Sequence, residues 1–443
     1  MSRLIRHLLC SVVAAAMSVN AGAQLLGVSA IPPIGLPVPA ANLPVAGPVL
    51  QNILAQPGAQ QAISPTLDTV GGLTETIANS GAPDLLELRC LRLDQLIRSN
   101  PATLESDGNG SPVRRGIVAV LNPDPSGLEA LLRSGFRIVA DQSETSLGVR
   151  MVSLATPRGM SARSGLKLVR KTAPQLEADF DHLFEPAGSS LAPMAGALAA
   201  FQGAASGRRL GMIDGGVASH PSLAGKSIEQ NGFAGPPEPT GHGTAVASLL
   251  VGSEGSFHGA ATGTQLFVAD VYGGNRAAGS ATAIVKALGW LSGHRPQVIN
   301  ISLVGPPNRL VERAIGIVQA QGIKVVAAVG NDGPAAPPQY PASYPGVVAV
   351  TAVDGGGRAL PEAGKASHLD FAAPGADMAA AAPGNGYTRV RGTSFAAPLA
   401  AARLLAAGSL AALSSEARPG KGRIGRGIVC GACRIDPRSV GVR

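Results

Sequence analysis

The sequence predicts an α/β protein whose main domain is a doubly wound, mostly parallel sheet, preceded by a small α+β domain of the ferredoxin-like type. Two observations carry this prediction. Over residues 208–413, short β-branched runs alternate with longer helical runs, a pattern typical of a buried parallel sheet covered by helices. Over residues 114–186, the runs follow the order β-α-β-β-α-β of the split ferredoxin-like unit.

The N-terminal residues 1–23 have the features of an export signal. Arg3 and Arg6 precede a short apolar run, and Ala21–Ala23 supplies the small residues of a cleavage site. Because the apolar run is too short to span a membrane comfortably, we expect an exported protein, periplasmic or extracellular, with no transmembrane domain. Residues 24–113 form a Pro- and Ala-rich extension that we expect to be partly disordered.

The helices and strands of the ferredoxin-like unit are predicted from the spacing of its apolar residues. In the first helical run, Leu128, Leu131 and Leu132 recur at helical intervals. The unit is expected to contain strands at 116–121, 137–144, 148–157 and 175–186, and helices at 126–136 and 162–173. Small residues at 187–207 then form a linker.

The main domain alternates between the two kinds of run. Strands are expected at 209–216, 265–273, 297–305, 323–331 and 346–354, and helices at 244–252, 280–293, 309–322 and 394–413. The last helix is almost wholly apolar. Its interior Pro398 and Arg403, with scattered Gly and Ser, favour a buried central helix over a membrane span.

Residues 414–443 form a basic C-terminal tail containing a C-x-x-C pair, Cys430 and Cys433. A structural zinc site needs about four ligands, and the sequence offers no second such pair. We therefore expect a disulfide, either between these two cysteines or from one of them to Cys90.

Charge and composition exclude several classes of function. The net charge is +8, but the basic residues are scattered arginines with no zinc-finger or RNA-binding motif, so no nucleic-acid partner is predicted. No acidic cluster suggests a tight calcium loop. We expect a monomer with no cofactor, and structural calcium stays open.

Four polar residues fall at the ends of predicted elements. Asp214 and Asn331 each end a strand, and His242 and Ser394 each open a helix. At its helix start, Ser394 is expected to be exposed. Because ligands of doubly wound sheets bind beyond the carboxyl ends of the strands, we expect these side chains to meet on one face.

These residue types suit a serine hydrolase. A serine hydroxyl is a weak nucleophile until a base such as neutral histidine accepts its proton, so Ser394 and His242 are the candidate reacting pair. Asp214 would orient the imidazole, and the Asn331 amide with the serine N–H would stabilise an oxyanion. Two alternatives stay open: a serine before an apolar run can cap a helix, and Asp270 also ends a strand.

The segments MIDGG, GHGTAVAS, VGNDG and GTSFAAP resemble the four signature blocks of the subtilisin-like serine peptidases, or subtilases. They stand in that family's order, which differs from the orders of chymotrypsin-like enzymes and α/β-hydrolases. The resemblance implies a subtilisin-like fold. It also implies an exported bacterial serine endopeptidase that cleaves proteins or peptides through an acyl-enzyme.

The resemblance also implies two walls of a substrate cleft. One resembles the edge strand that pairs with an extended substrate, and the other resembles a wall of the primary specificity pocket, near whose bottom Gln339 would lie. The residues are Ser302, Leu303, Val304 and Gly305 on the first, and Ala328, Val329 and Gly330 on the second.

The domain at 114–186 resembles the family's propeptide, which inhibits the protease and templates its folding. The resemblance therefore implies a zymogen, cut between about Glu185 and Arg209. One departure is Gly215, where the family usually has a hydroxyl residue. Together with the long N-terminal extension, this departure leaves open a catalytically weak subtilase-fold scaffold that binds or processes peptides. The Pro-rich segment leaves open a further alternative, a cell-surface interaction protein.

Overall fold

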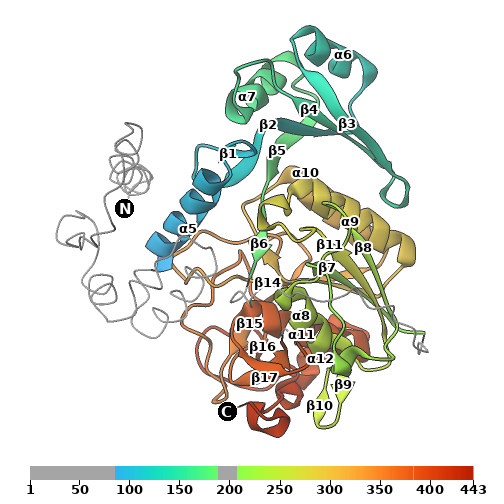
Figure 1. The fold of residues 1–443 in the computed structure, drawn as a ribbon, viewed down its shortest axis with the longest axis vertical. Helices are drawn as coiled ribbons and strands as arrows, with labels where there is room; N and C mark the ends of the chain where they lie inside the picture. Colours follow the sequence, from blue (N-terminus) through green and yellow to red (C-terminus); the bar gives the residue numbers. More distant parts are fainter. Residues whose placement is uncertain (1–84, 188–206, 383, 443) are drawn as a thin grey trace, which may run out of the picture.

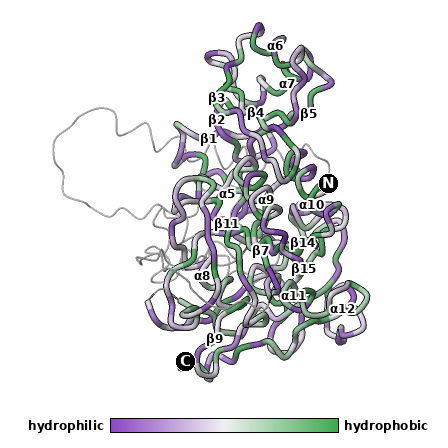
Figure 2. The backbone as a smooth tube through the Cα atoms, turned by 90° about the vertical axis from the view of Figure 1, so that its right-hand side faces the viewer, coloured by the Kyte–Doolittle hydropathy of each residue, from purple (hydrophilic) through white to green (hydrophobic). Residues whose placement is uncertain are grey.

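The computed structural model describes residues 85–187, 207–382 and 384–442. The expected export signal, the Pro-rich part of the extension and all but the first and last residues of the linker lie outside the described residues. Within these ranges the chain forms a small domain and a larger one, seen from two directions in Figures 1 and 2.

The described chain begins with a helix in the segment that the sequence analysis assigned to the extension. This helix is α5 (Leu85–Ser99), and β1 (Leu104–Ser106) follows it and pairs antiparallel with β2 (Pro112–Leu121). Leu85, Leu88 and Leu96 of α5 are buried, at a spacing that indicates an amphipathic helix. Folded structure therefore begins well before residue 114.

The small domain has the predicted β-α-β-β-α-β order. Its sheet runs β5 (Glu177–His182), β2, β4 (Val149–Ala155), β3 (Arg137–Glu144), with antiparallel neighbours throughout. Helices α6 (Pro125–Arg133) and α7 (Ala162–Thr172) share one apolar core with one face of that sheet. This part of the fold prediction is confirmed.

The other face of the small sheet packs on the larger domain. Val118 and Val120 of β2 belong to the core under α6 and α7. The alternate residues Ala119 and Leu121 belong instead to a core that includes α9 (Ala281–His294) and α10 (Arg309–Ala320). Since successive side chains of a strand point to opposite faces, β2 contributes side chains to the cores of both domains. Figures 1 and 2 both show the small domain beside α9 and α10.

The larger domain is a doubly wound parallel sheet, as predicted. Its seven strands lie in the order β16 (Phe371–Pro374), β15 (Val348–Val353), β14 (Lys324–Ala328), β12 (Val298–Ile301), β7 (Arg209–Asp214), β11 (Gln265–Asp270), β8 (Ile228–Gly232). Helices α8 (Gly241–Val251) and α11 (Thr393–Ala407) pack in the core of one face, and α9 and α10 in the core of the other. The first strand, β7, lies inside the sheet between β12 and β11, so later strands are added on both sides of it.

The single helix expected at 394–413 is two helices. Gly408 ends α11 in a left-handed conformation with φ of 76°, and the Ser409 side chain caps α12 (Leu410–Glu416). The two axes differ by 112°. Among the described residues, no single helix is long and apolar enough to cross a membrane.

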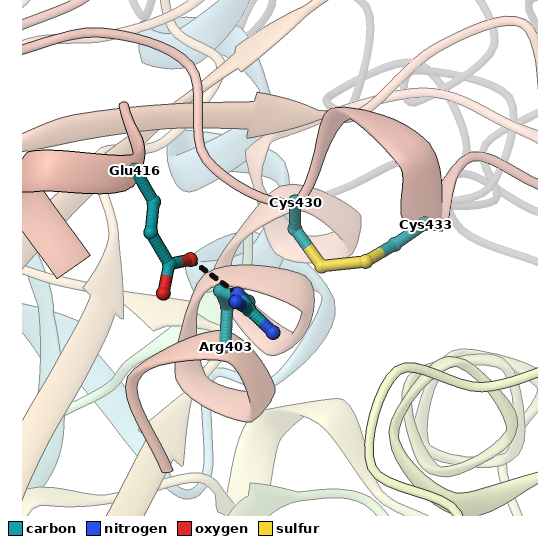
Figure 3. Close-up of a disulfide and its surroundings, with 4 residues drawn as sticks. All are labelled: Arg403, Glu416, Cys430 and Cys433. Carbon is teal, nitrogen blue, oxygen red and sulfur yellow. Dashed lines mark hydrogen bonds and ion pairs between the residues drawn. A yellow bond between two sulfur atoms is a disulfide. The ribbon is translucent and has the colours of Figure 1, made fainter. Parts of the chain in front are cut away.

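The C-terminal tail folds back onto the larger domain. Ile428 forms a bridge with Ala372 of β16, and Val429 and Ile435 join the core of α8 and α11. Figure 3 shows the Cys430–Cys433 disulfide near the ion pair between Arg403 of α11 and Glu416 of α12. Cys90 takes no part in this disulfide.

Candidate active site

Asp214 and His242 meet at the carboxyl end of strand β7. Asp214 is the last residue of β7, and His242 lies in the first turn of α8. The Nδ1 atom of His242 lies 2.8 Å from Oδ1 of Asp214, which also accepts a 2.8 Å hydrogen bond from the N–H of Gly215. Both side chains are buried. This contact fixes the orientation of the imidazole ring.

Close packing accounts for the glycine after this aspartate. A Cβ atom on Gly215 would lie 2.3 Å from Oγ1 of Thr240, far inside normal contact. The same hydroxyl caps α8 by accepting the N–H of Gly243. The space that a hydroxyl residue would need at position 215 is therefore filled by the cap of the histidine's own helix.

Ser394 lies in the first turn of α11, and its hydroxyl is not joined to the histidine. The Oγ atom donates to the carbonyl of Ser302 at 3.1 Å, while the buried Nε2 atom of His242 has no hydrogen-bond partner among the described residues. We expected Ser394 to be exposed, but it is wholly buried, because the segment that ends at Ala187 crosses it.

Two N–H donors converge on the carbonyl oxygen of Ala187. They are the backbone N–H of Ser394, at 3.0 Å, and the side-chain amide of Asn331. The Thr393 hydroxyl also donates to this oxygen, from 3.4 Å. The amide oxygen of Asn331 in turn accepts the N–H of Thr393 at 3.0 Å, so the NH₂ group is directed at Ala187. A carbonyl oxygen held by two such donors is polarised toward nucleophilic attack.

The residues before Ala187 run through the site as an added strand. Strand β6 (Glu185–Pro186) pairs antiparallel with β13 (Leu303–Val304), and the N–H of Ala187 donates to the carbonyl of Ser302 at 2.9 Å. On the other side, the N–H of Phe184 donates to the carbonyl of Gly279 at 2.7 Å. This is the pairing geometry by which proteins bind extended peptides.

The segment around Gly279 was missed by the sequence analysis. It contributes the second side of the added strand, including a bridge between Leu183 and Ser280. Apart from the glycine itself, which marks close backbone approach, an irregular loop carries no periodic signal that could have identified it.

The predicted walls of the cleft lie in different environments. Gly305 packs so closely on the Phe184 ring that a Cβ atom would come within 2.5 Å of it. Gly330 lies against Val304 and Gln339, and Gln339 is buried. Ala328 and Val329 are buried at the end of β14, and their role in substrate binding stays a prediction.

The alternative aspartate has other partners. The carboxylate of Asp270 accepts the backbone N–H groups of Glu238, Tyr272 and Gly273, which organise a turn. Burial raises the pKa of Asp270, and these three N–H groups only partly offset that effect. It is Asp214, and not Asp270, that holds the histidine.

The other histidines considered lie outside this contact. His220 is buried in the loop after β7, with ring nitrogens bonded to Ser222 and to the carbonyl of Gly386. His258 is exposed. Among the described residues, no group of three or more His, Cys, Asp or Glu side chains is arranged to hold a metal ion.

The larger domain is similar in sequence to known proteins. A model of the subtilase family matches residues 205–417. Subtilisin Savinase from Lederbergia lenta is 33% identical over 201 residues, covering 44% of this chain and 73% of that protein. The alkaline protease of Alkalihalobacillus alcalophilus is also 33% identical, covering 44% of this chain and 52% of that protein, so the chain spans about half its length.

The similarity of fold extends further than that of sequence. The crystal structure of fervidolysin from Fervidobacterium pennivorans, a keratinolytic enzyme related to subtilisin, matches with a TM-score of 0.59 at 19% identity. The match covers 72% of this chain and 60% of fervidolysin, and it bears on the fold alone.

Proposed function

Since this chain belongs to the subtilase family and is thereby a serine endopeptidase that acts on proteins, we propose that Asp214, His242 and Ser394 are its catalytic triad. The contact between the aspartate and the histidine supports this assignment. We also propose that the Asn331 amide and the Ser394 N–H form the oxyanion hole. The observation that carries the proposal is the convergence of both donors on the Ala187 carbonyl.

The reaction begins when the Ser394 hydroxyl turns from the Ser302 carbonyl to the unpaired Nε2 of His242. The histidine accepts the proton as Oγ bonds to the substrate carbonyl carbon, and Asp214 stabilises the imidazolium. The oxyanion is held by the two donors that now hold Ala187. Collapse breaks the C–N bond, His242 protonates the leaving amine, and water then releases the acyl group by the reverse sequence.

The first substrate in this proposal is the chain itself. Because the carbonyl of Ala187 occupies the oxyanion hole, we propose cleavage of the Ala187–Gly188 bond, within the predicted processing segment 187–207. The domain before it then acts as an inhibitor, since strand β6 fills the cleft in the orientation of a substrate. The chain is in this view made as a zymogen.

The proposal also covers the export of the protein, its oligomeric state and its need for cofactors. The signal-like residues 1–23 suit an exported enzyme, periplasmic or extracellular. Each proposed step uses only groups of the chain, the substrate and water, and we propose that the processed enzyme is a monomer that acts without a cofactor. A structural calcium ion stays compatible with this mechanism.

A fluorophosphonate probe tests the assignment, because it reacts with an activated serine and not with an ordinary one. We expect the processed protein to be labelled at Ser394 and to hydrolyse casein. Ser394→Ala should lose both properties and keep its thermal unfolding transition. A folded protein that neither reacts with the probe nor cleaves casein would favour the alternative of a catalytically weak scaffold, and Ser394→Ala with normal turnover would exclude the triad.

A further inference from the structure

Two arginines of α5 converge on an aspartate beside the oxyanion hole. The Nε atom of Arg89 lies 3.1 Å from Oδ2 of Asp332, and a terminal nitrogen of Arg92 lies 3.0 Å from Oδ1. Asp332 is 4% exposed, and both arginine side chains are less than a fifth exposed. Burial opposes the charge of Arg92, but the attraction of Asp332 and Glu185 outweighs it and raises the pKa of Arg92 above its usual value.

Arg92 also contacts the strand that fills the cleft. The nitrogen that lies 3.0 Å from Asp332 lies 3.3 Å from Oε2 of Glu185. The Glu185 oxygen and the Asp332 oxygen are therefore separated by at most the sum of these two distances, about 6 Å. Like charges at this separation in a partly buried setting repel each other, and Arg92 between them removes that repulsion.

Glu185 lies two residues before Ala187, whose carbonyl belongs to the bond proposed to be cut. Ala187 presents its carbonyl to the oxyanion hole, so Glu185 is the third residue counting back from the proposed cleavage point. Asp332 directly follows the oxyanion-hole residue Asn331. The side chain at the third substrate position thus extends toward the carboxylate of Asp332.

Both cations that pair with Asp332 in the described structure belong to α5, which precedes the proposed cleavage point. Their removal with the N-terminal segment leaves the Asp332 carboxylate on the edge of the cleft without them. A cation brought by a substrate can then replace them. An arginine side chain reaches two bonds further from Cα than a glutamate, about 2.5 Å, which brings its guanidinium within ion-pair distance of Asp332.

We propose that Asp332 is a specificity-determining residue of the processed enzyme and selects peptides with a basic side chain, above all arginine, at the third position before the cleaved bond. This inference rests on the proposed peptidase function and on the assignment of Ala187 to the first position. It also gives α5 a role. Its arginines compensate the unfavourable Glu185 for as long as fragment 85–187 stays docked, and they leave together with Glu185 when that fragment dissociates.

The test uses enzyme that the full chain has produced by its own cleavage. Three internally quenched peptides carry Leu-Phe-X-Pro-Ala-Gly, the sequence of residues 183–188, with X as Arg, Gln or Glu. We expect kcat/KM to be about tenfold higher for Arg than for Glu at low salt, because an ion pair is gained and a repulsion removed. The ratio should shrink in 0.5 M salt, because added ions screen both the attraction and the repulsion at the edge of the cleft.

Asp332→Asn should bring the Arg/Glu ratio close to one, while Asp332→Glu should keep a preference for Arg. Glu312→Gln is the matched control, because it removes one exposed negative charge on α10, and it should keep the wild-type ratio. A wild-type ratio near one, or an unchanged ratio in Asp332→Asn, would overturn the inference. Failure to cleave any of the three peptides would instead refute the peptidase function on which it rests.

Discussion

The backbone N–H of Ser394 donates a hydrogen bond of 3.0 Å to the carbonyl oxygen of Ala187. This contact joins a helix of the larger domain to the end of the strand that leaves the smaller one. A carbonyl in this position is one that the serine can attack, so the relationship identifies both a candidate oxyanion hole and a candidate bond to be cut. It also explains why Ser394 is buried although it opens a helix.

The wild-type chain should cut itself between Ala187 and Gly188. N-terminal sequencing of the active protein should find a terminus that begins Gly-Ser-Ser, and Ser394→Ala should remain uncut under the same conditions. Further trimming within residues 188–206 would leave the fragment that ends at Ala187 detectable by mass spectrometry. An active enzyme that still carries residues 114–187 covalently attached would contradict the prediction.

Asn331→Ala should lower kcat by about 10²–10³ with little change in KM, because its amide is used mainly on the tetrahedral intermediate. Steady-state kinetics on a peptide substrate measures the split between the two constants. The alanine variant also loses the acceptor for the N–H of Thr393, so Asn331→Asp, which keeps an acceptor there, is the useful companion. A loss found wholly in KM would argue against an oxyanion role.

Phe184→Ala in the small domain should weaken its inhibition of the processed enzyme. The Phe184 side chain is fully buried and packs on Gly305, and its loss should raise the inhibition constant by about 100-fold, the size expected for removing a buried aromatic ring. Inhibition of wild-type enzyme by the added fragment 85–187 measures this. Val139 of β3 is exposed, and Val139→Ala should leave inhibition unchanged.

Stability should fall as the pH falls below about 6.5, in part through His220. Burial lowers the pKa of His220 below its usual value, so the folded state keeps the ring neutral while the unfolded state binds a proton. The stabilisation from the neutral His220 ring is therefore complete above the pKa that the histidine has in the unfolded state. It is lost as the pH falls toward the lower pKa of the folded state, by at most about 1.4 kcal/mol per pH unit. Urea unfolding of Ser394→Ala at pH 8 and pH 5 should show this loss, and adding His220→Gln should reduce it.

The sequence predicts the periodic parts of the fold and the ends where the polar residues lie. Strands β7, β11 and β14 and helices α8, α9 and α10 follow from local hydrophobic spacing. Helix α5 has the same kind of spacing, but the Pro-rich residues before it led us to treat the whole segment as an extension. The break at Gly408 went unpredicted because an alanine-rich run continues across it.

The contacts of the site were less predictable than its residues. The Asp214–His242 contact follows from two element ends meeting on one face. The pairing of Phe184 with Gly279, and the ion pairs of Arg92, depend on where segments distant in sequence come together. No local pattern encodes such contacts. The hydrogen bond from Ser394 to Ser302 belongs to this class too, because a hydroxyl takes whichever acceptor the packed site presents.

The last prediction concerns the small domain as a template for folding. Its strand β5 supplies two buried aspartates to helix starts of the larger domain. Asp181 accepts the N–H of Thr282 in the first turn of α9 at 2.9 Å, and Asp179 accepts the N–H of Arg309 at the start of α10 at 2.9 Å. Carboxylates at these positions satisfy unpaired N–H groups and interact favourably with the helix dipole.

These contacts join two helices that the parallel sheet must otherwise order through distant pairings, which is slow. We therefore expect the catalytic segment that begins at Gly188 to refold from urea at least tenfold faster when fragment 85–187 is added. Asp179→Ala together with Asp181→Ala in the fragment should remove most of that acceleration. Asp141→Ala, at an exposed ion pair with Arg150 on β3 and β4, should keep it. Equal refolding with and without the fragment would show that the small domain is an inhibitor only.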